Sequence, residues 1–257
     1  MCRTVVVTGA TSGLGAVTAR ELARAGAHVV LAVRDTAWGE RLAATLTGSV
    51  EVRPLDLADL SSVRAFAAGR DRPLDVLVNN AGVMAIPEAR TADGFEMRIG
   101  TNHLGPFALT NLLLPHLTGR VVTVVDDINS ERAYSPWRAY QQSKLANLLF
   151  TRELQRRLSE SGSPVTAHAV HPGYAATDLQ GRSAGTAQRL MLAVTNRLMA
   201  QSDAMGALPT LYAATQPLPG NSYTGPDGRG ELRGHPGPAR RSPHAEERLT
   251  GVRFRRV

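Results

Sequence analysis

The chain is poor in cysteine, lysine and aromatic residues. Its 257 residues include one cysteine, Cys2, one lysine, Lys144, and only 5% aromatics. A single cysteine excludes an internal disulfide framework, which suits a reducing compartment. No apolar run approaches the roughly 18 residues of a membrane span. The chain enters a strand-like segment at Thr4–Val7 with no signal peptide before it, so we expect a cytoplasmic protein without a membrane partner.

Positive charge is in excess, because the formal net charge is +7. A basic balance can indicate a nucleic-acid or membrane partner. Here the arginines are interleaved with acids, and the local excess over residues 228–257 has no aromatic residue beside it except Phe254. We therefore expect a solvated basic tail and a small-molecule substrate, with no nucleic acid. No group of His, Cys, Asp or Glu has metal-ligand spacing, so no metal is expected.

Strand-like and helix-like segments alternate along the chain. Apolar runs predict strands at residues 5–7, 28–33, 50–55, 74–78, 120–125 and 164–170, with a short last strand near 222–223. Helical spacing predicts helices at 13–26, 36–46, 60–68, 101–117, 137–159, 184–200 and 203–215. This alternation is typical of a doubly wound parallel sheet with helices on both faces. We expect a single domain over residues 1–257, with Gly- and Pro-rich loop or tail over 217–243.

A glycine-rich turn joins the first strand to the first helix and reads Thr8-Gly9-Ala10-Thr11-Ser12-Gly13-Leu14-Gly15. A phosphate needs backbone N–H groups and a helix N-terminus, and bulky side chains would block its approach. Gly9 permits the tight turn, Gly13 lets the backbone approach the ligand, and Gly15 lets the helix pack against the strand. The turn therefore predicts a dinucleotide-binding site.

The spacing Thr-Gly-x-x-x-Gly-x-Gly resembles the signature of the short-chain dehydrogenase/reductase family. Further motifs of that family follow in order: Asp56-Leu57, Asn79-Asn80-Ala81-Gly82, Asn102 in Thr-Asn-His-Leu-Gly, Tyr140-x-x-x-Lys144, and Pro172-Gly173-x-x-x-Thr177. The sequence around these motifs is most similar to the branch of retinol dehydrogenases and protochlorophyllide reductases. The resemblance covers roughly residues 3 to 235. It implies a Rossmann-type fold, a nicotinamide cofactor and a homo-oligomer, dimer or tetramer.

The resemblance also implies which residues contact the cofactor. They are Gly9, Thr11, Ser12, Gly13, Leu14 and Gly15 in the turn, then Arg34, Asp56, Leu57, Asn79, Ala81, Gly82, Tyr140, Lys144, Pro172, Gly173 and Thr177. Arg34 directly follows the second strand, where an arginine accepts a ribose 2′-phosphate and an acid binds a 2′-hydroxyl. This position favours NADP(H). Asp35, one residue later, is expected to begin the next helix.

Tyr140 and Lys144 are four residues apart on a predicted helix, so they share one face. A nearby ammonium group favours the phenolate and lowers the pKa of a tyrosine, which brings it toward the range useful for general acid–base catalysis. In the family, the matching lysine also holds the nicotinamide ribose. By the same resemblance, Asn102 would position a water for proton relay.

The family's catalytic serine is missing at the end of the fifth strand. Relatives have Ser-Ser where this chain has Val125-Asp126, and Asp126 lies 14 residues before Tyr140. A second alignment deletes the serine together with about a dozen residues after it. Asp126 could be a neutral donor in an apolar pocket, a general acid for other chemistry, or a relic.

Three functions remain open at this point. The first is an NADP-dependent oxidoreductase acting on a hydroxyl or carbonyl group, with Tyr140 as acid/base. The second is a non-redox enzyme, such as a cyclase, dehydratase or isomerase, that uses Tyr140 or Asp126 for proton transfer. The third is a protein that binds NADP(H) without catalysis.

Substituting Asp126→Ser tests the first alignment. One oxyanion donor contributes about 10²–10³ in turnover, and an ionised carboxylate about 4 Å from a developing alkoxide adds roughly 4 kcal/mol of repulsion at an effective dielectric of 20. The substitution should therefore raise the rate of carbonyl reduction at least tenfold, measured as NADPH consumption. A fall or no change would contradict this alignment and favour the deletion or a new role for Asp126.

Overall fold

The computed structural model describes residues 3–84, 86–125, 135–173 and 202–239, without the side chains of residues 135–142 and of Lys144. Asp126 and Thr177 lie outside the described residues, as do the helix expected at 184–200 and most of the basic tail. Tyr140 and Lys144 are therefore placed by the helix backbone alone.

An eight-stranded sheet forms the centre of the molecule, in the order β3-β2-β1-β4-β5-β6-β7-β8. The strands are β1 Thr4–Thr8, β2 His28–Val33, β3 Ser49–Pro54, β4 Leu74–Asn79, β5 Leu117–Val124, β6 Thr166–Val170, β7 Tyr223–Pro226 and β8 Pro236–Pro238. All neighbouring pairs are parallel except β7 with β8. The strand order reverses at β1, whose neighbours are β2 and β4.

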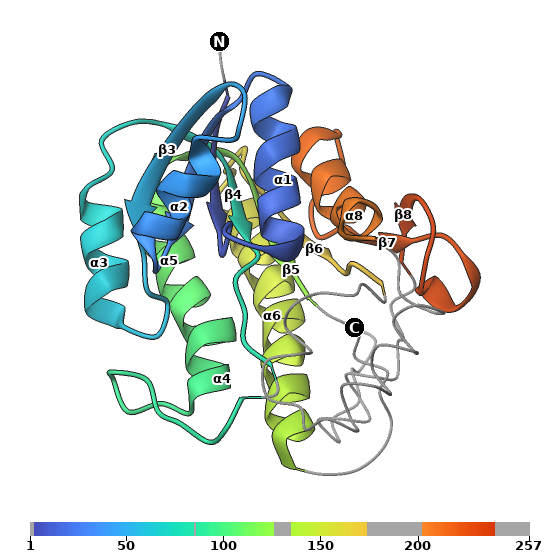
Figure 1. Cartoon of the computed structure of the whole chain (residues 1–257). Coiled ribbons are helices and arrows are strands. Elements are labelled where there is room, and N and C mark those ends of the chain that lie inside the picture. The colour runs from blue at the N-terminus through green and yellow to red at the C-terminus, as the bar shows by residue number, and fades with distance from the viewer. Residues whose placement is uncertain (1–2, 85, 126–134, 174–201, 240–257) are drawn as a thin grey trace.

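Helices cover both faces of this sheet (Figure 1). They are α1 Gly13–Arg24, α2 Thr36–Ala43, α3 Leu60–Ala68, α4 Met97–Ile99, α5 Gly105–Leu113, α6 Ser135–Glu160 and α8 Asp203–Thr215. A π-helical turn, η1 Gly100–Leu104, joins α4 to α5, and short 3-10 turns lie at η2 Leu114–His116 and η4 Arg229–Glu231. The expected doubly wound architecture is confirmed.

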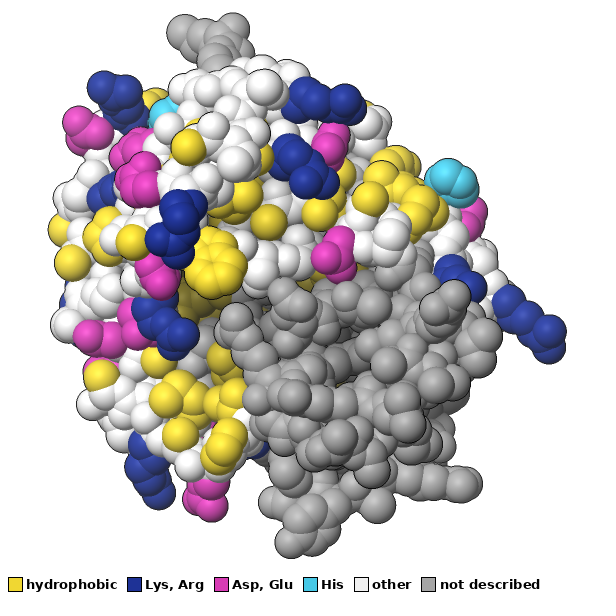
Figure 2. All heavy atoms as spheres, viewed as in Figure 1, with side chains coloured by type: hydrophobic (Ala, Val, Ile, Leu, Met, Phe, Trp, Pro, Cys, Tyr) yellow, Lys and Arg dark blue, Asp and Glu magenta, His cyan; other side chains and the backbone are white. Residues whose placement is uncertain are grey.

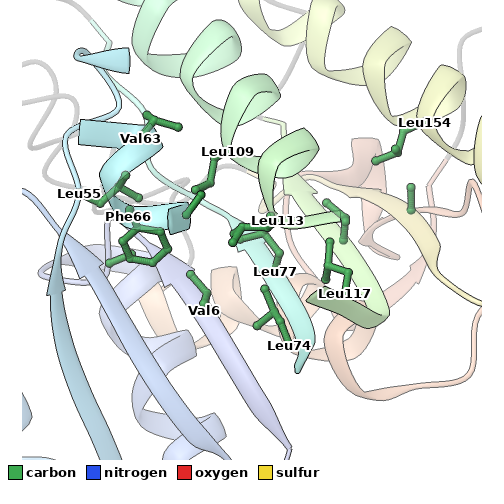
Figure 3. Close-up of a cluster of buried hydrophobic side chains, with 14 of the residues drawn as sticks. Val6, Leu55, Val63, Phe66, Leu74, Leu77, Leu109, Leu113, Leu117 and Leu154 are labelled. Atoms are coloured by element: carbon green, nitrogen blue, oxygen red, sulfur yellow. The ribbon is translucent and has the colours of Figure 1, made fainter. Parts of the chain in front are cut away.

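Alternate residues of each strand enter two separate cores. In β1, Val6 packs with residues of α3, α5 and α6, whereas Val5 and Val7 pack with residues of α1 and α8. This alternation follows from the two-residue period of a strand. The first core includes Phe66, Leu77, Leu109 and Leu113 (Figure 3). The two cores hold α5 and α6 on one face and α1 on the other.

The long helix expected at 101–117 is interrupted. Instead of one helix, the segment contains η1, then α5, then η2, and β5 begins at Leu117 rather than at residue 120. Pro106 lies in the first turn of α5. Proline has no backbone N–H and its ring crowds the carbonyl four residues earlier, which disturbs a regular helix at that point.

The Gly- and Pro-rich stretch contains more structure than expected. Strand β7 extends to Pro226, and β8, which the sequence analysis missed, pairs with it in antiparallel orientation. Because β8 has the sequence Pro-Gly-Pro, it carries few backbone N–H donors and lacks the apolar run expected of an interior strand. It is the last strand of the sheet, and an edge is where proline is tolerated.

No helix within the described ranges combines the length and the apolar composition needed to cross a bilayer. On the face shown in Figure 2, basic and acidic side chains lie interspersed.

Two neighbouring leucines of α5 provide a matched test of this packing. Leu113 is fully buried and Leu112 is 42% exposed. Leu113→Ala removes buried methyl groups and leaves a cavity, so it should lower the free energy of unfolding by about 2–5 kcal/mol. Leu112→Ala should change it by about 0.5 kcal/mol or less. Denaturant unfolding measures both, and equal losses would contradict this orientation of α5.

Candidate functional site

A cleft of about 440 Å³ lies at the carboxyl ends of β1 to β4, beside the point where the strand order reverses. Ligands of open α/β sheets bind at this place. The predicted residues that line it are Gly9, Thr11, Ser12, Gly13, Leu14, Gly15, Arg34, Asp56, Leu57, Ala81 and Gly82. Residues that the sequence analysis did not assign also line it, among them Thr8, Trp38, Asn80, Val83, Thr101 and Val124.

The glycine turn is shaped by close contacts that exclude side chains. Gly9 and Gly13 have positive φ angles of 63° and 53°, which favour glycine. A Cβ atom on Gly9 would lie 2.8 Å from Cα of Ala81, and one on Gly15 would lie 2.4 Å from the carbonyl oxygen of Gly9. The sequence predicted that Gly15 lets α1 pack against the first strand. In the structure, Gly15 allows α1 to pack closely against Gly9, directly after β1, and against Asn80.

The N-terminus of α1 points its backbone at the cleft without a side-chain cap. Ser12 makes no capping hydrogen bond with its side chain, and the first turn contains no acidic residue. The first N–H groups of a helix have no partner within the helix, and the helix dipole adds a partial positive charge there. These groups suit an anion, so the turn fits the pyrophosphate of a dinucleotide.

Asn80 holds the turn against the end of β4. Its side-chain amide donates to the carbonyl oxygens of Thr8 and Gly9 at 2.9 and 3.3 Å. The Thr8 hydroxyl in turn accepts from the backbone N–H of Asn80 and of Ala81, both at 3.0 Å. The preceding Asn79 is buried away from the cleft and donates to the Thr110 hydroxyl at 3.0 Å. The sequence analysis assigned Asn79 as a cofactor contact, and Asn80 is the one that lines the cleft.

Arg34, Asp35 and Trp38 line another part of the cleft, where β2 meets α2. Asp35 caps α2, as expected, because its carboxylate accepts from the backbone N–H of Trp38 at 2.9 Å. Trp38 is 49% exposed, and the Arg41 guanidinium lies 5.5 Å from the centre of its ring. Sequence alone could not separate an aromatic wall of a cleft from a core aromatic on an amphipathic helix.

Asp56 is held in place at the end of β3 by backbone contacts. Its carboxylate accepts from the N–H of Ala58 at 2.9 Å, and its own N–H donates to the Ser62 hydroxyl at 2.9 Å. Leu57 follows and is buried while still lining the cleft. Asp56 and Leu57, predicted as cofactor contacts, thus both line the cleft.

Glu96 caps α4, the short helix directly before the π-helical turn that contains Asn102. The Glu96 carboxylate accepts from the N–H of Arg98 and of Ile99 at 2.9 and 3.0 Å and pairs with the Arg98 guanidinium at 2.7 Å. Burial raises the pKa of Glu96, but the hydrogen bonds from Ile99 and Arg98 outweigh it and hold that pKa below its usual value. The carboxylate therefore caps α4.

Asn102 lies in the π-helical turn and is 1% exposed. Its side chain accepts from the N–H of Val83 at 2.7 Å and donates to the carbonyl oxygen of Val83 at 2.9 Å. It thereby fixes Val83, which lines the cleft. Asn102 itself is not among the lining residues, so its described role is to support the cleft wall.

Helix α6 places Tyr140 and Lys144 one turn apart and packs against η1 through Ser143, in the same turn, and Asn147, in the next. Ser143 is fully buried and accepts from the Asn102 side chain at 3.3 Å. Asn147 donates to the carbonyl oxygen of Asn102 at 2.9 Å. The sequence analysis missed Asn147, because an asparagine inside a helix has no pattern that reveals its distant partner.

Pro172 and Gly173 follow β6 and do not line the cleft. Gly173 has a φ of 68°, and a Cβ atom there would lie 2.5 Å from the carbonyl oxygen of Leu232. His171, which precedes Pro172, is 5% exposed, and its ring Nε2 lies 3.2 Å from the Glu231 carboxylate. This end of β6 is therefore packed against the segment around η4.

No group of three His, Cys, Asp or Glu side chains in the described part of the chain is arranged to hold a metal ion. The described chemistry is instead that of a dinucleotide cleft: backbone donors at a helix N-terminus, an arginine near the second strand, and a helix that carries a tyrosine and a lysine.

Comparison with known proteins agrees with this geometry. The family model described as short chain dehydrogenase matches residues 3–187. Retinol dehydrogenase 12 of Homo sapiens is 48% identical over an alignment of 200 residues that covers 69% of this chain and 63% of that protein. The match thus spans less than two thirds of that relative's length.

Two crystal structures are also similar. An uncharacterised protein from Mycobacterium paratuberculosis is 54% identical, with a TM-score of 0.77 over 98% of this chain and 95% of its own. A protein from Beutenbergia cavernae, described as an NAD(P)-dependent gluconate 5-dehydrogenase with bound NADP, is 30% identical, with a TM-score of 0.64 over 82% of this chain and 88% of its own. The chain belongs to the short-chain dehydrogenase family, in the branch of the retinol dehydrogenases.

Proposed function

We propose that this chain is an NADP(H)-dependent oxidoreductase that interconverts a hydroxyl group and a carbonyl group. The observation that carries the proposal is the cleft at the reversal of strand order, with the uncapped N-terminus of α1 and the glycine turn at its wall. Family membership supports the nicotinamide, because relatives in this branch are named dehydrogenases.

The preference for NADP(H) rests on the residues after β2. Arg34 lines the cleft and offers a guanidinium, which binds phosphate through charge-assisted hydrogen bonds. Asp35 is the acid that could bind a ribose 2′-hydroxyl, but its carboxylate already accepts from the N–H of Trp38. The bound NADP of the Beutenbergia cavernae protein is consistent with this preference.

When bound, NADP(H) would supply or accept the hydride. Tyr140 would give a proton to the carbonyl oxygen in reduction and take it back in oxidation, as a general acid or base. Lys144, one turn later on α6, would stabilise the phenolate by its charge. Asn102 would hold the cleft wall through Val83, and a water relay at Asn102 stays a prediction.

The substrate is proposed as a small molecule with a primary or secondary alcohol, or the matching aldehyde or ketone. The relative from Homo sapiens is named for retinol, an alcohol of this kind. Asp126 in place of the family's serine makes the active site non-standard in this proposal. The homo-oligomer and the cytoplasmic location expected from the sequence stay predictions.

The reaction itself is tested by absorbance at 340 nm with NADP⁺ and a panel of alcohols, and with NADPH and a panel of aldehydes and ketones. Turnover is expected with at least one panel member. Tyr140→Phe should lower it by at least 100-fold, because general acid–base catalysis contributes about 10²–10⁴. Product formation without a change at 340 nm would contradict the proposal and favour a non-redox enzyme.

Arg34 can be tested apart from the chemistry with 2′,5′-ADP, a fragment that carries the 2′-phosphate. Arg34→Ala should weaken its binding about tenfold or more, since hydrogen bonds to charged groups contribute about 1.5–3 kcal/mol, and should leave 5′-AMP binding within threefold. Arg24→Ala is the control, because Arg24 is exposed at the far end of α1. Calorimetry measures the binding of both fragments to the parent protein and to the two variants. Equal effects of Arg34→Ala on both fragments would refute the assignment.

A further inference from the structure

The carbonyl oxygen of Asn102 cannot receive the α-helical hydrogen bond from four residues later in the chain. In a regular helix the N–H of residue 106 would donate to it, but residue 106 is proline. Asn102 is 1% exposed, so water does not replace that donor at low cost. A buried carbonyl without a partner would destabilise the turn.

Asn147 supplies a hydrogen bond to this carbonyl from another helix. Its side-chain amide donates to the carbonyl oxygen of Asn102 at 2.9 Å. Asn147 is 2% exposed, and its own backbone carbonyl accepts from the Thr151 hydroxyl at 2.8 Å. The bond therefore joins α6 to the π-helical turn across a buried contact.

His103 holds the Asn147 amide in this orientation. The ring Nδ1 of His103 lies 2.9 Å from the side-chain oxygen of Asn147. Because the Asn147 nitrogen donates to Asn102, its oxygen must accept, and Nδ1 of His103 carries the donated proton. The His103 ring also lies 6.2 Å, between centres, from each of the Phe107 and Phe150 rings.

This contact connects the two halves of the candidate active site. On one side, Asn102 fixes Val83, a residue of the cleft wall, by two hydrogen bonds. On the other side, α6 carries Lys144 three residues and Tyr140 seven residues before Asn147, which places all three near one side of the helix. A shift or rotation of α6 would therefore move Tyr140 and Lys144 relative to the cleft.

We propose that Asn147, oriented by His103, is a positioning residue that sets the place of helix α6, and so of Tyr140 and Lys144, against the cofactor cleft. This role rests on the proposed function. It requires a hydrogen bond from residue 147 to the Asn102 carbonyl, and a donor at residue 103, rather than an aromatic ring there.

The pair His103→Asn and His103→Phe separates the two roles of His103. Asparagine places an N–H at nearly the position of the histidine Nδ1 but lacks the ring, whereas phenylalanine keeps the ring and lacks the donor. We expect His103→Asn to recover kcat to within threefold of the parent protein and His103→Phe to lower kcat at least tenfold. Any other ordering of these two variants would overturn the role of His103 in orienting Asn147.

Asn147→Leu removes both hydrogen bonds of this side chain and replaces it with a side chain of similar size. We expect kcat to fall at least tenfold, because a displacement near 1 Å can cost 10²-fold in rate. NADPH affinity should fall less than kcat, because the glycine turn and α1 pack on the opposite face of the sheet from α6. Asn111→Leu is the control, since exposed Asn111 bonds only within α5, to the carbonyl oxygen of Phe107. A loss of NADPH affinity as large as the loss of kcat would overturn the proposal.

Amide hydrogen exchange provides a readout that needs no turnover. The Val83 N–H donates to Asn102, so Asn147→Leu and His103→Phe should speed its exchange at least tenfold, while His103→Asn and Asn111→Leu should not. If the parent protein oxidises or reduces nothing in the panels, the proposed function fails. This exchange pattern still tests whether Asn147 and His103 hold Asn102 and Val83 in place. Unchanged Val83 exchange in Asn147→Leu would refute it.

Discussion

The side-chain amide of Asn80 and the carbonyl oxygens of Thr8 and Gly9 make the contact on which the site depends. These bonds tie the first turn of the chain to the end of β4, across the reversal of strand order. With the turn held there, Gly15 allows α1 to begin close behind it, so that its backbone N–H groups face the cleft. Backbone geometry suits this place to an anion, and no cationic side chain is needed for that.

The far wall of the cleft depends on a second, separate constraint. Pro106 removes a helical donor, and the turn at Gly100–Leu104 widens to the π form where Asn102 supports Val83. Such single-turn widenings are frequent at functional sites. The helix with Tyr140 and Lys144 meets the cleft at this turn, through Ser143 and Asn147. In the proposed active site, the cofactor half is thus built on β1 and β4, and the placement of the catalytic half depends on side-chain hydrogen bonds.

Local signals in the sequence were sufficient for much of the fold. Helices α3 and α8 have the bounds expected from their patterns, because Asp59 and Ser202 cap them with side-chain hydrogen bonds to nearby N–H groups. The glycine turn and Arg34 were also assigned to the cleft in which they lie. Each of these features depends on residues close in sequence.

Features that depend on distant contacts were missed. Within the segment expected as one helix at 101–117, the carbonyl oxygen of Asn102 bonds to Asn147, 45 residues later. Strand β8 exists because β7 offers it a partner at the sheet edge, and nothing in Pro-Gly-Pro indicates a strand. Asn79 and Asn80 are adjacent and chemically equal, so only the direction of each side chain from β4 separates the one that lines the cleft from the one that bonds Thr110.

A fluorescence titration of the parent protein with NADPH, with NADH as the comparison, tests the central claim most directly. The account predicts saturable binding of NADPH that is at least tenfold tighter than that of NADH, because both bind the glycine turn but only NADPH carries the 2′-phosphate for Arg34. Absence of binding by either nucleotide would contradict the account, since the turn and the N-terminus of α1 would then be an inherited scaffold without a ligand.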